Sequence, residues 1–140
     1  MHRTVRKPSC SADSMQPRTG DYLRTADRNR DVARELAFAP FKTPPSDWAA
    51  VIAFYAALHF MHAYLFEREN GREPTSHKDR RNCMETVAGL MPAEDNYNDL
   101  YDLSVKVRYR SLYRINGATV QEALDNMGEV ERVVRKGLGA

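Results

Sequence analysis

The chain has 140 residues, which is enough for one domain with a buried core. Charged residues make up 29% of it but the formal net charge is only +2, which indicates an ordinary solvated surface and excludes a strongly basic protein specialised for polyanions. The two cysteines, Cys10 and Cys83, form neither a disulfide framework nor a C-x-x-C metal pair, so we expect a reducing, cytoplasmic location.

Residues 1–20 contain prolines, serines and basic side chains but almost no apolar ones. Such a segment buries too little surface to offset the entropy of ordering, so we expect a disordered basic tail in front of a single domain over residues 21–138. No apolar stretch follows the N-terminal arginines, which argues against a secretory signal. A transit peptide, a contact with a phosphate backbone and a native start at Met15 remain open alternatives.

The first predicted helix covers Asp21–Phe38, where apolar residues recur at helical spacing. The next, Asp47–Phe66, is the most apolar stretch of the chain, and a helix that is apolar nearly all round lies either in a core or in a membrane. Its length approaches the roughly 18 apolar residues from which a segment becomes a candidate transmembrane helix. Its alanines and its two histidines favour the central helix of a soluble bundle, which we expect to end at Asn70-Gly71.

The remaining sequence predicts three more helices. Ser76 with Asp79 resembles a capping box that opens a third helix, which Pro92 ends. A fourth is expected from Ala93 to Ile115, closed by Asn116-Gly117, and a capping box of Thr119 with Glu122 opens a fifth. Strand-length alternation is absent from the sequence, so the predicted fold class is all-α: an antiparallel four-to-five-helix up-and-down bundle.

Several segments resemble the HEPN superfamily, in particular its uncharacterised bacterial members. The most specific are FYAALH at 54–59, Ser76-His77 with Arg80, and Leu100 or Leu103 near Ser104 followed by Arg108-Tyr109. The resemblance covers roughly residues 20–114. It implies a helical bundle that usually dimerises. Many members of the family are toxin or defence ribonucleases, whereas others are catalytically silent and pair with a nucleotidyltransferase or bind nucleotides.

The nuclease branch of this superfamily uses an arginine followed after four to six residues by a histidine, late in the bundle. Arg108 is well placed to be that arginine, but no histidine follows it, and Tyr113 stands where one would be expected. A literal match from Arg72 to His77 crosses a Gly/Pro loop into a helix start. The resemblance therefore implies a component of a toxin–antitoxin or defence-type system that binds RNA, a nucleotide or a partner protein without efficient catalysis. The alternative is a metal-independent ribonuclease.

If the third and fourth predicted helices pack as neighbours, basic, imidazole and aromatic side chains of three helices would meet in one candidate site. The catalytic candidates are His59, His77 and Arg108, and the ligand- or anion-binding candidates are Arg80, Arg81, Tyr109 and Tyr113. Arginine binds phosphate bidentately, and histidine exchanges protons near neutral pH. Arg108 falls on the apolar stripe of its predicted helix, where an unpaired guanidinium is costly to bury. It therefore requires either a carboxylate, for which Asp27, Asp79 and Asp102 are candidates, or an external anion.

We expect neither a metal nor a cofactor. His59 and His62 share a helix face and with His77 could supply three imidazoles, but their helix carries no carboxylate between Asp47 and Glu67. The expected partners are a second copy of the chain, a nucleotidyltransferase-type protein, and RNA or a nucleotide, with no membrane.

Overall fold

The computed structural model describes residues 15–42, 45–110 and 113–139, which form an all-α bundle without a strand in those ranges. The helices are α1 (Pro17–Ala37), α2 (Ser46–Arg68), α3 (His77–Thr86), α4 (Glu94–Tyr109) and α5 (Gly117–Leu138), with a short 3-10 helix, η2 (Met91–Ala93), before α4. The all-α prediction is confirmed. The predicted tail up to residue 14, with Cys10, lies outside the described residues.

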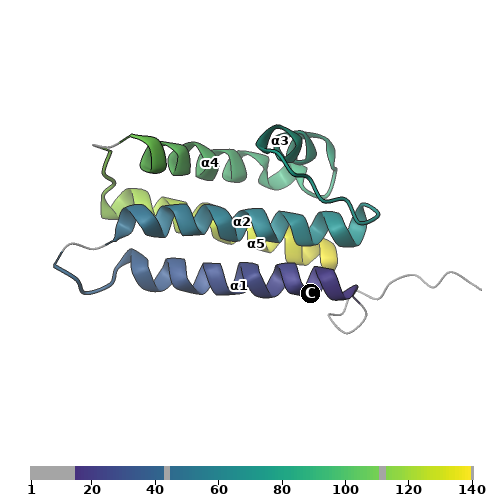
Figure 1. The fold of residues 1–140 in the computed structure, drawn as a ribbon, viewed down its shortest axis with the longest axis horizontal. Coiled ribbons are helices and arrows are strands. Elements are labelled where there is room, and N and C mark those ends of the chain that lie inside the picture. Colours follow the sequence, from purple (N-terminus) through teal and green to yellow (C-terminus); the bar gives the residue numbers. More distant parts are fainter. Residues whose placement is uncertain (1–14, 43–44, 111–112, 140) are drawn as a thin grey trace, which may run out of the picture.

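Helix α2 is the centre of the bundle. Figure 1 shows it between α1 and α4, with α5 behind it, and α2 packs against all three. Among the described helices α2 is long and apolar enough to cross a membrane, but 72% of its apolar window is buried inside the bundle. Its side chains thus provide the core that was predicted for this segment.

Alanines line the contact between α1 and α2 and let the two helices approach closely. Ala26 and Ala33 on α1 and Ala53 and Ala57 on α2 are all fully buried. The start of α1 is also tied to the end of α2, because the buried hydroxyl of Thr19 donates to the Glu67 carboxylate at 2.8 Å.

Two helix starts differ from the prediction. Helix α1 begins at Pro17, so residues 17–20 belong to a helix instead of the tail, because the fixed φ of proline suits the first turn. Helix α5 begins at Gly117, where the Asn116 side chain accepts a hydrogen bond from the Thr119 N–H. The predicted capping box at Thr119 was therefore wrong: Asn116 opens α5 as its N-cap.

Two helix ends also came earlier than expected. Helix α3 begins as predicted, with the Ser76 hydroxyl accepting from the Asp79 N–H, but it ends at Thr86, before Pro92. Helix α4 ends at Tyr109 and does not continue to Ile115. The end of α2 was predicted correctly, since both residues of Asn70-Gly71 have positive φ.

Candidate functional site

His59 lies half-buried on α2, with the Tyr22 ring of α1 6.4 Å from its own ring. Its Nδ1 is 2.8 Å from the Tyr55 carbonyl oxygen one turn earlier. A carbonyl oxygen only accepts, so Nδ1 carries the proton of the neutral ring and Nε2 keeps a lone pair. His59 can therefore accept a proton or a hydrogen bond through Nε2.

His62, one turn further along α2, is buried and neutral. The Arg80 Nε–H donates to His62 Nε2 at 3.3 Å, and the Tyr22 ring lies 5.2 Å from the imidazole. Burial first, and then the positive charge of Arg80, lower the pKa of His62 to about 4. The contact thus holds Arg80 against α2 and leaves His62 unsuited to proton transfer near neutral pH.

His77 begins α3 and stacks on Tyr101 of α4, with 3.4 Å between ring centroids and 9° between ring planes. Burial, and then the charges of Arg81 and Arg80, lower the pKa of His77. A shallow depression of about 390 Å³ is lined by His77, Lys78, Arg81, Asn82 and Glu85. His77 and Arg81 are therefore brought together, on the outer side of α3.

Arg108 lies at the end of α4 among oxygen acceptors and aromatic rings. Its Nε and Nη2 each lie 3.2 Å from an oxygen of Ser104, and its guanidinium carbon lies 6.0 Å from the Tyr55 ring centroid and 5.0 Å from that of Tyr109. Tyr109 is 74% exposed.

Within the described residues Arg108 forms no salt bridge, so none of the three carboxylate candidates pairs with it and the other alternative, an external anion, stays a prediction. Asp27 pairs with Arg30 and with Arg135 instead. Asp79 pairs with Arg72 at 3.0 Å.

Contacts connect most of the predicted residues across α2. We call this set the band; its members are His59, His77, Arg80, Arg81, Arg108 and Tyr109 from the prediction, together with Tyr22, Tyr55, Lys78 and Tyr101. Tyr55 connects two catalytic candidates, His59 on α2 and Arg108 on α4. Its carbonyl oxygen accepts from His59, and its ring lies under the Arg108 guanidinium. His77 joins the same side through Tyr101, whose ring packs 5.6 Å from that of Phe54.

Tyr113 lies elsewhere, against the prediction. It lines a recess of about 340 Å³ between α4 and α5 together with Asp99, Asp102, Lys106 and Glu122. This recess is rich in carboxylates and does not suit an anion.

Arg72 and His77, the literal arginine–histidine match, are engaged in separate contacts. Arg72 Nη2 binds the Asp79 carboxylate at 3.0 Å, whereas His77 stacks on Tyr101. The two side chains therefore do not form a preassembled pair. The residues that the structure describes also contain no group of three or more His, Cys, Asp or Glu side chains that could hold a metal ion.

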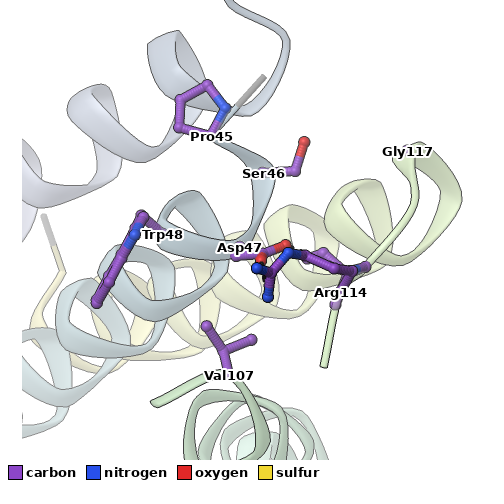
Figure 2. Close-up of a pocket in the computed structure, with 8 residues that line it drawn as sticks. Pro45, Ser46, Asp47, Trp48, Val107, Arg114 and Gly117 are labelled. Atoms are coloured by element: carbon purple, nitrogen blue, oxygen red, sulfur yellow. Dashed lines mark hydrogen bonds and ion pairs between the residues drawn. The ribbon is translucent and has the colours of Figure 1, made fainter. Parts of the chain in front are cut away.

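A cavity of about 620 Å³ lies apart from this band at the start of α2 (Figure 2). One Asp47 carboxylate oxygen accepts from the Ile115 N–H at 3.2 Å, and the other lies 3.7 Å from Arg114 Nη1. Asp47 thus anchors the connection between α4 and α5, which is a structural role. None of the predicted site residues lines this cavity.

Sequence reasoning missed four members of the band: Tyr22, Tyr55, Lys78 and Tyr101. A signal existed for Tyr55, which precedes His59 by four residues and His62 by seven, so all three lie on one helix face. Tyr22 and Tyr101 come from other helices, and only packing places them here.

Comparison with known proteins gave one family. The family model described as the HEPN domain matches residues 19–137, which is most of the chain and includes every residue of the band. No curated protein matches the chain.

Proposed function

The chain belongs to the HEPN domain family, and from that premise we propose that it binds single-stranded RNA as a component of a toxin–antitoxin or defence-type system, without efficient catalysis. Membership of the family indicates an RNA-related or toxin/defence-type role. The finer assignment, to RNA binding on the α3–α4 side of the bundle, is supported by the arrangement of charges and rings there.

The observation that carries the proposal is the surroundings of Arg108. Within the described residues no carboxylate neutralises its guanidinium, which lies between the rings of Tyr55 and Tyr109. Tyr109 is 74% exposed. Proteins that bind single-stranded nucleic acid combine positive side chains, which contact the phosphates, with exposed aromatic rings, on which the bases stack.

A second basic group extends this surface. His77, Lys78 and Arg81 line the depression on α3, and Arg80 is held one turn away by His62. RNA that crosses from α3 to the end of α4 would meet positive charge at both places. Backbone contacts of this kind bind RNA with little dependence on its sequence.

Efficient catalysis is not part of the proposal, because among the described residues neither Arg108 nor Arg72 contacts a histidine. The nine residues after Arg108 contain no histidine, and Arg72 is bound to Asp79. His59, whose Nδ1 donates to the Tyr55 carbonyl, is connected to Arg108 through Tyr55.

The proposal is tested by titrating a labelled single-stranded RNA with the protein and following fluorescence anisotropy. We expect Arg108→Ala to weaken binding about tenfold and to reduce the slope of log affinity against log salt by about one. Tyr109→Ala should weaken RNA binding by a similar factor but leave the salt dependence of the affinity unchanged, because stacking involves no charged group. Arg132→Ala is the control, since this exposed arginine on α5 pairs with Glu129. Equal losses for Arg108→Ala and Arg132→Ala would show only nonspecific attraction.

The alternative, a metal-independent ribonuclease, is favoured by the link from Arg108 through Tyr55 to His59. It is tested by incubating RNA with the protein in a chelating buffer. The enzyme would be established if Arg108→Ala abolishes cleavage, if His59→Ala or His77→Ala does so as well, each as a single substitution, and if Arg132→Ala retains it. Binding without cleavage by the wild-type protein supports the proposed function.

A further inference from the structure

The cavity at the start of α2 has an aromatic wall that is open to solvent. Trp48 lines this cavity, and its side chain is 58% exposed although it belongs to the most buried helix of the bundle. A single exposed aromatic side chain is ordinary on a protein surface. One that lines a cavity offers a flat apolar face to a ligand, and small ligands bind in concave sites of this kind.

The other side of the cavity carries charge. Figure 2 shows Trp48 on one side and the Asp47–Arg114 pair on the other, with Val107 of α4 below them. The Arg114 side chain is 72% exposed, whereas the Asp47 side chain is only 22% exposed. An anion that approaches from solvent therefore meets the guanidinium before the carboxylate. The cavity combines an aromatic wall with a cation at its rim.

Two lining residues connect the cavity to the RNA contact proposed at Arg108, although no member of the band lines it. Val107 directly precedes Arg108 on α4. On α2, Trp48 precedes Tyr55 by seven residues, which is about two helical turns or about 10 Å along the axis. The Tyr55 ring in turn lies under the Arg108 guanidinium. A strand that is bound at Arg108 and continues toward the start of α2 therefore reaches Trp48.

We propose that the cavity receives one base of the bound RNA, stacked on the Trp48 indole, while a neighbouring phosphate faces the Arg114 guanidinium. This inference rests on the proposed function and adds to it a second stacking site besides Tyr109. The volume of about 620 Å³ falls within the range of ligand pockets and leaves room for a base with its ribose.

The base site determines which class of RNA is preferred. Every base has a flat face, so stacking on Trp48 tolerates any sequence. The bases of a duplex are already stacked and paired, whereas those of a single strand can turn outward onto an aromatic side chain. Charge at Arg108 and Arg114 attracts both kinds of RNA. Trp48 therefore favours single strands over duplexes.

Trp48 is the only tryptophan of the chain, so its fluorescence reports on the cavity directly. The full-length protein is titrated with a single-stranded RNA in parallel samples, one followed by the anisotropy of a labelled strand and one by tryptophan emission with unlabelled strand. We expect the emission to be quenched over the concentrations at which the anisotropy rises, because a stacked base quenches an indole. Long-chain polyphosphate, which carries the charge without bases, should displace the labelled RNA and leave the emission unchanged. Duplex RNA should likewise bind without quenching.

Substitutions at Trp48 separate stacking from charge. Trp48→Ala should weaken the binding of single-stranded RNA about tenfold and leave its salt dependence unchanged, whereas Trp48→Phe, which keeps a ring, should recover most of the affinity. Phe41→Ala is the matched control, because Phe41 is 60% exposed but does not line the cavity. This variant should bind RNA as the wild type does. Circular dichroism should confirm that the variants are folded.

The base site and the proposed function fail in different ways. If anisotropy detects no binding of RNA to the wild-type protein, the proposed function is wrong and the base site with it. If RNA binds but the emission of Trp48 does not change, or polyphosphate or duplex RNA quenches it equally, the base site alone is overturned. Equal affinities of Trp48→Ala and Phe41→Ala would also overturn it. The wild-type emission decides the question even where Trp48→Ala fails to fold.

Discussion

At the scale of single residues, three arginines of the described ranges show two kinds of surroundings. Arg30 and Arg135 are each paired with carboxylates of other turns and helices, and both are largely withdrawn from solvent. Arg108 has oxygen and aromatic neighbours but no carboxylate among the described residues. The first kind stabilises the bundle, whereas the second keeps its charge available to an anion from outside. This difference in partners, which composition does not reveal, is the reason for placing the RNA contact at Arg108.

His62 should make the stability of the protein depend on pH. The folded protein keeps its ring neutral until the pH falls to about 4, whereas the unfolded chain protonates it near 6.5. Between these values the unfolded state binds more protons, so this contribution is complete above pH 6.5 and is lost as the pH falls. His62→Gln keeps an acceptor for Arg80 but cannot titrate. Urea unfolding at pH 7 and pH 4.5 should show a loss about 2.5 kcal/mol smaller in His62→Gln than in the wild type.

Two glycines of α5 provide a matched test of packing. A Cβ on Gly137 would lie 2.6 Å from Cε2 of the buried Tyr64 ring, whereas nothing lies within 4 Å of a Cβ on Gly128. We expect Gly137→Ala to destabilise the protein by about 1–3 kcal/mol through overpacking. Gly128→Ala should stabilise it by about 0.5–1 kcal/mol, because alanine loses less backbone entropy in a helix. Urea unfolding measures both, and equal effects at the two positions would contradict the packing described for Tyr64.

At the scale of elements, an ion-pair network fastens α1 to α5. Glu131 accepts from Arg30 Nη1 at 2.6 Å and from Arg135 Nε at 2.9 Å, and its side chain is 16% exposed. Glu131→Gln should cost about 2 kcal/mol of unfolding free energy, because two largely buried guanidinium groups lose a charged acceptor. Glu129→Gln, in the same helix, removes an exposed, solvent-screened pair with Arg132 and should cost much less. Thermal or urea unfolding of the two variants separates a structural network from a surface pair.

Helix centres could be predicted from the sequence, but several helix ends could not. Periodicity located α1 because buried faces repeat every three to four residues, whereas α2 was found from its continuous apolar run and α3 from the cap at Ser76. Asn116-Gly117 fits both the end of one helix and the cap of the next, and only the hydrogen bond from the Thr119 N–H to the Asn116 side chain decides for the cap. Pro17 was assigned to the tail because its neighbours are polar, yet the contact of Thr19 with Glu67 from α2 holds that turn in the helix.

The candidate site was predictable where its members share a helix and not where they come from different ones. His59 and Arg108 could be identified by residue type, but their connection runs through Tyr55, whose ring faces α4 only in the folded bundle. Tyr113 is the opposite case. It follows Arg108 closely in sequence and was therefore grouped with it, but α4 ends at Tyr109 and Tyr113 lines the recess between α4 and α5.

At the scale of the whole molecule, burial is distributed unevenly, and the α3 part of the candidate site lies on the helix with the fewest buried residues. Helix α2 contributes fourteen buried residues, whereas α3 contributes only Cys83 and Met84. Figure 1 shows α3 at one end of the bundle, beside α4. Elements with few buried contacts open first in native-state fluctuations, and binding surfaces are often drawn from them. The side chains of α3 can therefore adjust to a ligand without disturbing the core around α2.

Hydrogen exchange should reveal this gradient and its coupling to RNA. We expect amides of α3 to exchange fastest among the helices and those in the middle of α2 slowest, since α2 amides exchange only when the whole bundle opens. Saturating single-stranded RNA should slow exchange in α3 and at the end of α4 but not on the outer face of α5, because a ligand stabilises the states that bind it. Arg108→Ala, compared at the same RNA concentration, should show less of this protection than Arg132→Ala. Protection that rises equally in every helix would indicate general stabilisation instead of contact, and protection confined to α5 would place the RNA on the wrong side of the molecule for the proposed function.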